Sequence, residues 1–175
     1  METRDIDRGE VLRYLGYGRH EADRRVMDLV EQCIEELGRE ASPLYLCRDY
    51  PLALGQEGLV DAGVFITRSR NLAKNLADCG RILVFAATLG TGADYLIGKY
   101  NRLQMSKAVV MQAAAAAMIE EYCDQVCAGL KAYYETDGWY LRPRFSPGYG
   151  DFPLDCQSRL LDCLEAGKRI GIKLP

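Results

Sequence analysis

A single long helix, predicted from Met105 to Tyr134, constrains the fold of this chain more than any other sequence feature. Apolar and small residues persist along this whole stretch, and residues 113–117 are consecutive alanines. Such small side chains let a neighbouring element or a ligand approach the helix closely, although the high helix propensity of alanine is an alternative explanation. We expect close packing of another element against this part of the helix.

Shorter helices and strands are predicted around the long helix from the spacing of apolar residues. The expected helices cover 7–15, 21–39, 69–79, 95–100 and 158–167, and the expected strands cover 44–47, 63–66 and 82–85. The helix at 21–39 carries a stripe of apolar residues that is expected to be buried in the core, formed by Val26, Leu29, Val30, Cys33, Ile34 and Leu37. Thr91 and Asp94 are expected to cap a further helix start. Strands and unequally spaced helices in this order indicate an α+β fold.

Length and composition indicate one soluble domain over 1–175, with two intimate subdomains as the alternative. The formal net charge of −3 disfavours general nucleic-acid binding, which needs clustered lysine and arginine. No apolar run is long enough for a membrane span, so a cytoplasmic protein is expected. The seven cysteines have no regular framework, and we expect most of them to be buried thiols.

The segment 139–153 differs from the rest of the chain, because it combines prolines and glycines with five aromatic residues. Flexible linkers favour glycine, serine and small polar residues, and five aromatic rings would be costly to leave exposed. We therefore expect an ordered functional loop.

Within this loop, Arg144, Gly148 and Tyr149 have the chemistry of a ligand site. Arginine can hold a carboxylate with two hydrogen bonds, glycine lets a ligand approach the backbone, and a tyrosine ring attracts a cation. Taken alone, the same residues also fit a surface salt bridge, a turn and a core aromatic.

The sequence Arg144-Phe145-Ser146-Pro147-Gly148-Tyr149 resembles the Arg-x-x-x-Gly-Tyr motif of the activation domain of cobalamin-dependent methionine synthase, which binds S-adenosylmethionine (SAM). Pro153 matches a proline that follows the motif in that family. The resemblance extends to the flanking segments 10–17 and 167–174, which look like parts of the stand-alone versions of the domain.

This resemblance implies a central, mainly antiparallel twisted sheet flanked by helices, and a site for SAM at Arg144, Ser146, Gly148 and Tyr149. Ser146 corresponds to a position whose backbone contacts SAM. The cobalamin is carried by a partner, a corrinoid-binding methionine synthase, and the electron comes from a flavodoxin- or ferredoxin-like protein. The chain itself would be an accessory module without independent turnover, which supports reductive methylation of cob(II)alamin.

Two departures from the family pattern stand out. Gly150 replaces a proline that commonly follows Gly-Tyr, so a less rigid loop is expected. The sequence given ends at Pro175, whereas the family continues into a segment that contacts the adenosyl end of SAM. We therefore expect the C-terminal segment of the family to be missing and SAM binding to be weak.

Two other functions remain open from the sequence. The turn at Gly90-Thr91-Gly92 suggests a conventional SAM-dependent methyltransferase, although Tyr95 stands where a dinucleotide-binding motif needs its third glycine. A module that binds a corrinoid protein but has lost its SAM site is the second alternative. The lone histidine, His20, lacks the sequence context of a cobalamin ligand, and we expect it on the surface.

Overall fold

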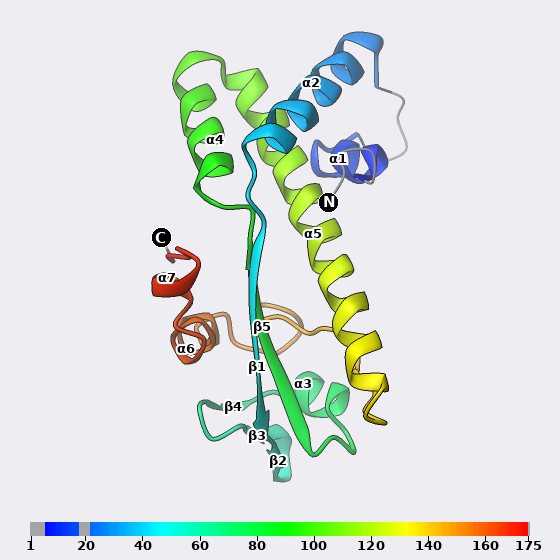
Figure 1. Ribbon diagram of the computed structural model, residues 1–175, viewed down its shortest axis with the longest axis vertical. Coiled ribbons are helices and arrows are strands. Elements are labelled where there is room, and N and C mark those ends of the chain that lie inside the picture. The colour runs from blue at the N-terminus through cyan, green and yellow to red at the C-terminus, as the bar shows by residue number, and fades with distance from the viewer. Residues whose placement is uncertain (1–5, 18–21, 175) are drawn as a thin grey trace. The chain divides into compact units, whose positions relative to one another are not determined.

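The computed structural model describes residues 6–17 and 22–174 of the chain. The helices are α1 (Arg8–Tyr14), α2 (Arg24–Glu40), the 3-10 helix η2 (Gln56–Gly58), α3 (Arg70–Asn75), α4 (Thr91–Leu103), α5 (Met105–Glu135), α6 (Cys156–Cys163) and α7 (Ala166–Arg169). The strands are β1 (Leu44–Pro51), β2 (Ala53–Leu54), β3 (Leu59–Asp61), β4 (Ile66–Arg68) and β5 (Arg81–Thr88). Figure 1 shows these elements, coloured from blue near the N-terminus to red near the C-terminus.

The chain divides into two compact units, which we name the helical unit and the mixed unit. Among the described residues, the helical unit comprises 6–17, 22–44 and 87–126, and the mixed unit comprises 45–86 and 127–174. Helix α5 contributes its first turns to the helical unit and its last turns to the mixed unit. The expectation of one domain over 1–175 stays a prediction.

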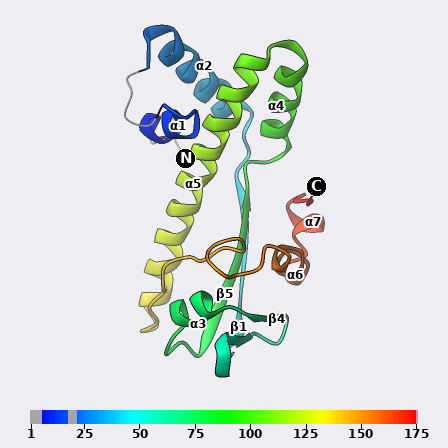
Figure 2. The same cartoon turned by 180° about the vertical axis from the view of Figure 1, so that it is seen from behind.

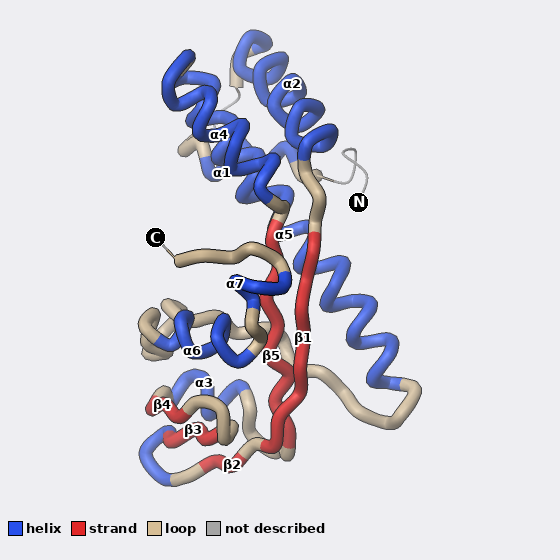
Figure 3. The backbone as a smooth tube through the Cα atoms, turned by 60° about the vertical axis from the view of Figure 1, so that its left-hand side comes forward, coloured by secondary structure: helices blue, strands red, loops and turns tan. Residues whose placement is uncertain are grey.

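The strands form two small sheets, so the combination of helix and strand is α+β as predicted (Figure 3). Strand β1 pairs with β5, while β2, β3 and β4 form an antiparallel sheet in which Val60 faces Thr67. The strand predicted at 63–66 is wrong for most of its length. Asp61 accepts a hydrogen bond from the Gly63 backbone N–H at 2.7 Å, and Gly63 has a φ of +74°, so these residues turn the chain before β4 begins.

The helical unit is built on the stripe predicted for α2. Val30, Cys33, Ile34 and Leu37 are fully buried, and they pack in one core with residues of α1, α4 and α5. Four of the five alanines at 113–117 are buried in the same core, which confirms the expected close packing around the middle of α5. Helix α5 itself ends within one residue of its predicted boundary.

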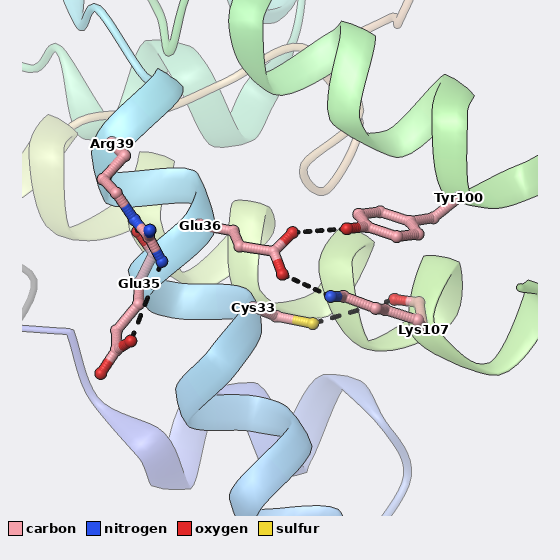
Figure 4. Close-up of polar contacts among 6 residues, drawn as sticks. All are labelled: Cys33, Glu35, Glu36, Arg39, Tyr100 and Lys107. Carbon is pink, nitrogen blue, oxygen red and sulfur yellow. Dashed lines mark hydrogen bonds and ion pairs between the residues drawn. The ribbon is translucent and has the colours of Figure 1, made fainter.

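A polar cluster lies between α2, α4 and α5 inside the helical unit (Figure 4). The Lys107 ammonium forms an ion pair with Glu36 and lies 4.3 Å from the ring centre of Tyr100. The Tyr100 hydroxyl donates a hydrogen bond of 2.7 Å to the other carboxylate oxygen of Glu36. Since the Lys107 side chain is only 11% exposed, its charged form is stabilised by these partners and little by water.

The ionisation of this cluster follows from its contacts. Burial on its own raises the pKa of Glu36, but the hydrogen bonds from Lys107 and Tyr100 and the lysine charge outweigh burial, so the pKa lies below its ordinary value. Burial likewise opposes the charge of Lys107, and the contacts with Glu36 and Tyr100 still raise its pKa. Both partners are therefore charged at neutral pH.

The cysteines form no disulfide, but the expectation that most are buried is wrong. Only Cys33 and Cys156 are buried, whereas Cys47 is exposed and the others are intermediate. Burial raises the pKa of the Cys33 thiol to about 11, so this thiol is neutral and acts as a small apolar side chain.

The helix start at α4 differs from the predicted capping box. Gly90, with a φ of +82°, is the N-cap, and no side chain caps the helix. Thr91 already has helical geometry, which prevents it from acting as the cap. A side chain at Gly92 would lie 2.2 Å from the Glu40 carbonyl oxygen, so this glycine is explained by the close approach of the backbone at the end of α2.

The mixed unit has its own core, made from the small β2–β3–β4 sheet, α3, β5 and the C-terminal helices. Leu160, Leu161 and Leu164 face this core as predicted. The single helix expected at 158–167 is interrupted, because Glu165 adopts left-handed backbone angles between α6 and α7. Among the described residues, no helix is both long and apolar enough to cross a membrane.

Candidate functional site

The loop that contains the Arg-x-x-x-Gly-Tyr motif runs from the end of α5 to the start of α6, past α3 (Figure 2). It belongs entirely to the mixed unit. Phe152 is 3% exposed within the core of that unit, and the partly buried Phe145 packs against the same core. The rings of Phe145 and Phe152 have centres 6.3 Å apart. Phe145 and Phe152 therefore anchor the loop, as expected for an ordered segment. The expectation that the aromatic rings of the loop are not left exposed is wrong for Trp139, Tyr140 and Tyr149.

Between these two phenylalanines, the backbone forms a compact turn. The Tyr149 N–H donates to the Ser146 carbonyl oxygen at 3.1 Å, and the Gly148 N–H donates to the Phe152 carbonyl oxygen at 2.8 Å. The Phe152 N–H in turn donates to the Tyr149 carbonyl oxygen at 3.0 Å. Gly148 has a φ of +92°, a conformation that costs glycine little and other residues more. The glycine of the motif is thus required by the turn itself.

Asp151 fixes this turn to the start of α3. One oxygen of its carboxylate accepts hydrogen bonds from the Ser69 hydroxyl at 2.5 Å and from the Asn71 N–H at 3.1 Å. The other oxygen accepts from the Arg70 N–H at 2.8 Å. The bond from Ser69, followed by those from the Asn71 and Arg70 N–H groups, holds the pKa of Asp151 below its ordinary value. The loop is thereby attached through an ionised carboxylate.

Ser69 makes this attachment possible because it connects the loop with the helix. The serine is 2% exposed, and its hydroxyl oxygen accepts a hydrogen bond from the Leu72 N–H at 3.0 Å while the hydroxyl donates to Asp151. It is therefore the N-cap of α3 as well as an anchor for the loop.

Gly150 is explained by the same contact. The φ of Gly150 is +54°, and a Cβ atom at this position would lie 2.2 Å from the side-chain amide nitrogen of Asn71 and 3.3 Å from the Asn71 Cβ. Proline cannot adopt a positive φ, so the proline common in the family at this position is incompatible with the turn seen here. The expected loss of rigidity is offset by the hydrogen bonds of Asp151.

The structure places all four residues predicted to bind SAM in this exposed stretch. Ser146, Gly148 and Tyr149 lie in one turn, and Arg144 precedes that turn by two residues. The Tyr149 side chain is 65% exposed, with its ring centre 6.3 Å from that of Phe145. Arg144 is also exposed.

The chemistry of these residues matches two charged groups of the methionine portion of SAM, its carboxylate and its sulfonium. A guanidinium matches a carboxylate, an aromatic ring matches a sulfonium cation, and a glycine leaves space beside the backbone. The donor set present is therefore compatible with the methionine portion of SAM.

Sequence reasoning missed Asp151 and Ser69, the two residues that hold the turn in place. Ser69 carried a signal, since it is the first residue of the helix predicted at 69–79 and serine is a preferred N-cap residue. The partnership with Asp151 had no local signal, because 82 positions separate the two residues.

The other positions singled out in the sequence give no second site among the described residues. His20 lies outside the described residues. Among 6–17 and 22–174, no cluster of histidine, cysteine and carboxylate side chains is arranged to hold a metal ion. At the turn of Gly90 and Gly92, close contact with the backbone of residues 40–42 accounts for both glycines without a ligand.

Comparison of the chain with models of known protein families gives no match, and comparison with characterised proteins gives no significant match. The geometry of the loop and the sequence motif are thus the grounds for the function proposed below.

Proposed function

We propose that this chain is a SAM-binding reactivation module that supports reductive methylation of cob(II)alamin on a partner corrinoid methionine synthase. The observation that carries the proposal is the anchored turn at 146–149, which leaves the Tyr149 ring exposed and lies next to Arg144. The same proposal includes a fold related to the methionine synthase activation domain, with a mainly antiparallel sheet flanked by helices.

Arg144 would bind the carboxylate of the methionine portion. Its planar guanidinium can donate two parallel hydrogen bonds to a carboxylate, which fixes the orientation of the ligand as well as its position. Lysine at this position would supply charge without this geometry.

Tyr149 would lie beside the sulfonium, where the face of an aromatic ring attracts a positive charge. The contact with Phe145 and the hydrogen bonds of the turn restrict where this tyrosine can lie. Gly148 and the backbone of Ser146 would form the surface along which the ligand rests. The rigid turn would reduce the loss of conformational freedom on binding.

When bound, SAM would supply its methyl group to the cobalamin of the partner, provided that a flavodoxin- or ferredoxin-like donor supplied one electron, and S-adenosylhomocysteine would be the leaving product. This chain contributes binding and orientation, because holding the methyl donor at the reacting centre favours the reaction that follows an unfavourable reduction. The cofactors supply the chemistry.

The test is the conversion of cob(II)alamin to methylcobalamin, followed by its visible spectrum, on the corrinoid methionine synthase of the same cell. SAM, the electron donor and this protein should all be required. Tyr149→Leu should slow methylation by about 2- to 30-fold, as expected for the loss of a cation–π contact. Tyr149→Phe, which keeps the ring, should retain most of the activity.

Tyr95→Leu is the matched control, since Tyr95 is 70% exposed on α4 and lies outside the proposed site. Docking to the corrinoid partner should be similar for all three variants. Equal rates with and without this protein would contradict the proposed function, once binding of SAM to the protein has been established by calorimetry.

A further inference from the structure

A pocket of about 530 Å³ lies in the mixed unit, apart from the four residues proposed to bind SAM. Its walls come from the last turn of α5, the segment 138–143, the turn between α3 and β5, and the strands β1 and β5. This volume lies within the range of small-molecule sites, roughly 300–1,000 Å³. None of Arg144, Ser146, Gly148 or Tyr149 lines the pocket, although Pro143 does.

Aromatic side chains form one part of the wall. Trp139 and Tyr140 are 47% and 77% exposed, and Tyr134 lines the pocket beside them. The backbone N–H of Trp139 donates to the Tyr134 carbonyl oxygen at 3.0 Å, which ties the backbone at the start of the loop to the end of α5. The Trp139 indole ring lines the pocket and offers a flat surface for stacking.

The charged groups of the pocket balance one another. Arg81 forms an ion pair with Asp49, and its guanidinium carbon lies 5.8 Å from the ring centre of Trp139. Arg142 donates a hydrogen bond of 3.1 Å to the Ala77 carbonyl oxygen, and Asp78 is the second carboxylate of the wall. Two guanidinium groups and two carboxylates give a formal charge of zero, which favours an uncharged ligand over a phosphate or a polycation.

The polar groups and the aromatic wall together select a particular chemistry. Carboxylates accept hydrogen bonds from amino groups, whereas guanidinium groups donate to ring nitrogens and hydroxyls. We propose that this pocket binds an uncharged heteroaromatic ring with donors and acceptors along its edge, namely a nucleoside, stacked on Trp139. The ligand has two possible sources, a free nucleoside or the adenosyl portion of SAM, and this inference does not depend on the proposed function.

The chain carries a built-in reporter for the test, because Trp139 is its only tryptophan. Adenosine titrated into the full chain should change the tryptophan emission saturably, and ribose, which has no aromatic ring, should not. Adenosine should also protect Trp139 from quenching by acrylamide. No saturable change with adenosine, or an equal change with ribose, would overturn the proposal.

Calorimetry on variants identifies the surface that binds the ring. Trp139→Leu should weaken adenosine binding by about fivefold or more, as expected for the loss of base stacking, while Trp139→Phe should restore part of it. Arg159→Ala, an exposed substitution on α6, should leave the affinity unchanged. Circular dichroism should show the same fold for each variant. Equal affinity in Trp139→Leu and the unaltered protein would overturn the proposal.

A SAM titration separates the two sources. If the adenosyl portion of SAM occupies the pocket, SAM should change the Trp139 emission at lower concentration than adenosine does, and Arg144→Ala should remove that advantage. If a free nucleoside is the ligand, adenosine should change the emission and SAM should not. Adenosine has no methionine carboxylate, so a failure of Arg144 to bind SAM leaves the adenosine result unaffected.

Discussion

The helical and mixed units place their polar groups in opposite ways. In the helical unit, Glu36, Tyr100 and Lys107 satisfy one another between three helices, and the lysine is nearly removed from solvent. In the mixed unit, the carboxylate of Asp151 holds an exposed turn on the surface of the unit. The first arrangement stabilises the interior, whereas the second fixes an exposed turn that carries Gly148 and Tyr149. Substitutions in the two regions should therefore separate effects on stability from effects on binding.

The largest effect is expected from Lys107→Met, because this change leaves the Glu36 carboxylate without its ionic partner. We expect the free energy of unfolding to fall by about 3 kcal/mol, measured by urea denaturation. Replacing Glu36 by leucine in the same chain should recover most of this loss, since no unpaired charge then remains.

The matched control is Arg39→Met, which breaks the exposed ion pair between Arg39 and Glu35 on the same helix (Figure 4). The expected change is below about 0.5 kcal/mol. If Lys107→Met costs no more than Arg39→Met, the interior cluster does not have the role assigned to it.

Gly150→Ala should have the next largest effect, because it combines backbone strain with a collision. The positive φ costs an alanine about 1–2 kcal/mol, and the added methyl must also displace Asn71. Gly138→Ala is the control, since Gly138 has a φ of +76° and open space around it. Thermal or urea unfolding should show a larger loss for Gly150→Ala, and equal losses would argue against close contact with α3.

At acidic pH, the change in the free energy of unfolding with pH should reflect the protonation of Glu36. Its pKa is lowered in the folded state, so its contribution is present above the unfolded pKa and is lost as the pH falls through the folded pKa. The window therefore lies below the ordinary value of 4.5. The unaltered protein should lose more stability than Glu36→Gln between about pH 6 and about pH 3. Parallel curves would contradict this assignment.

Asp151→Asn should have the smallest effect on global stability, since the carboxylate lies at the surface and α3 keeps its Ser69 cap. It should nevertheless weaken SAM binding, because the turn loses the charged anchor that positions Tyr149. Asp155→Asn, an exposed change at the start of α6, is the control for calorimetry. Unchanged SAM affinity in Asp151→Asn would show that the Asp151 carboxylate does not support the proposed SAM site.

The comparison of the two units also explains which features the sequence alone could predict. The stripe of α2 and the extent of α5 follow from local periodicity, and both are seen in the structure. The strand expected at 63–66 failed because Asp61 and Gly63 form a turn there, which the apolar run conceals. The partners of Asp151 were not predictable, because they depend on how distant segments fold together.

The candidate site likewise combines features that the sequence could predict with features that it could not. The motif predicts a SAM site at Arg144, Ser146, Gly148 and Tyr149, and the structure shows that the last three share one turn. The reason for Gly150 became evident only from its contact with Asn71, which no pattern in the loop indicates.

The most direct test of the proposed function is calorimetric titration of SAM into the unaltered protein, Arg144→Ala, Arg144→Lys and the control Arg159→Ala. Loss of a charge-assisted hydrogen-bonded pair should weaken binding by about 10- to 100-fold in Arg144→Ala. Lysine should restore only part of the affinity, because it cannot donate the paired bonds of a guanidinium. Arg159→Ala should bind as the unaltered protein does. SAM binding that is equally strong in Arg144→Ala and in the unaltered protein would contradict the assignment of this loop as the SAM site.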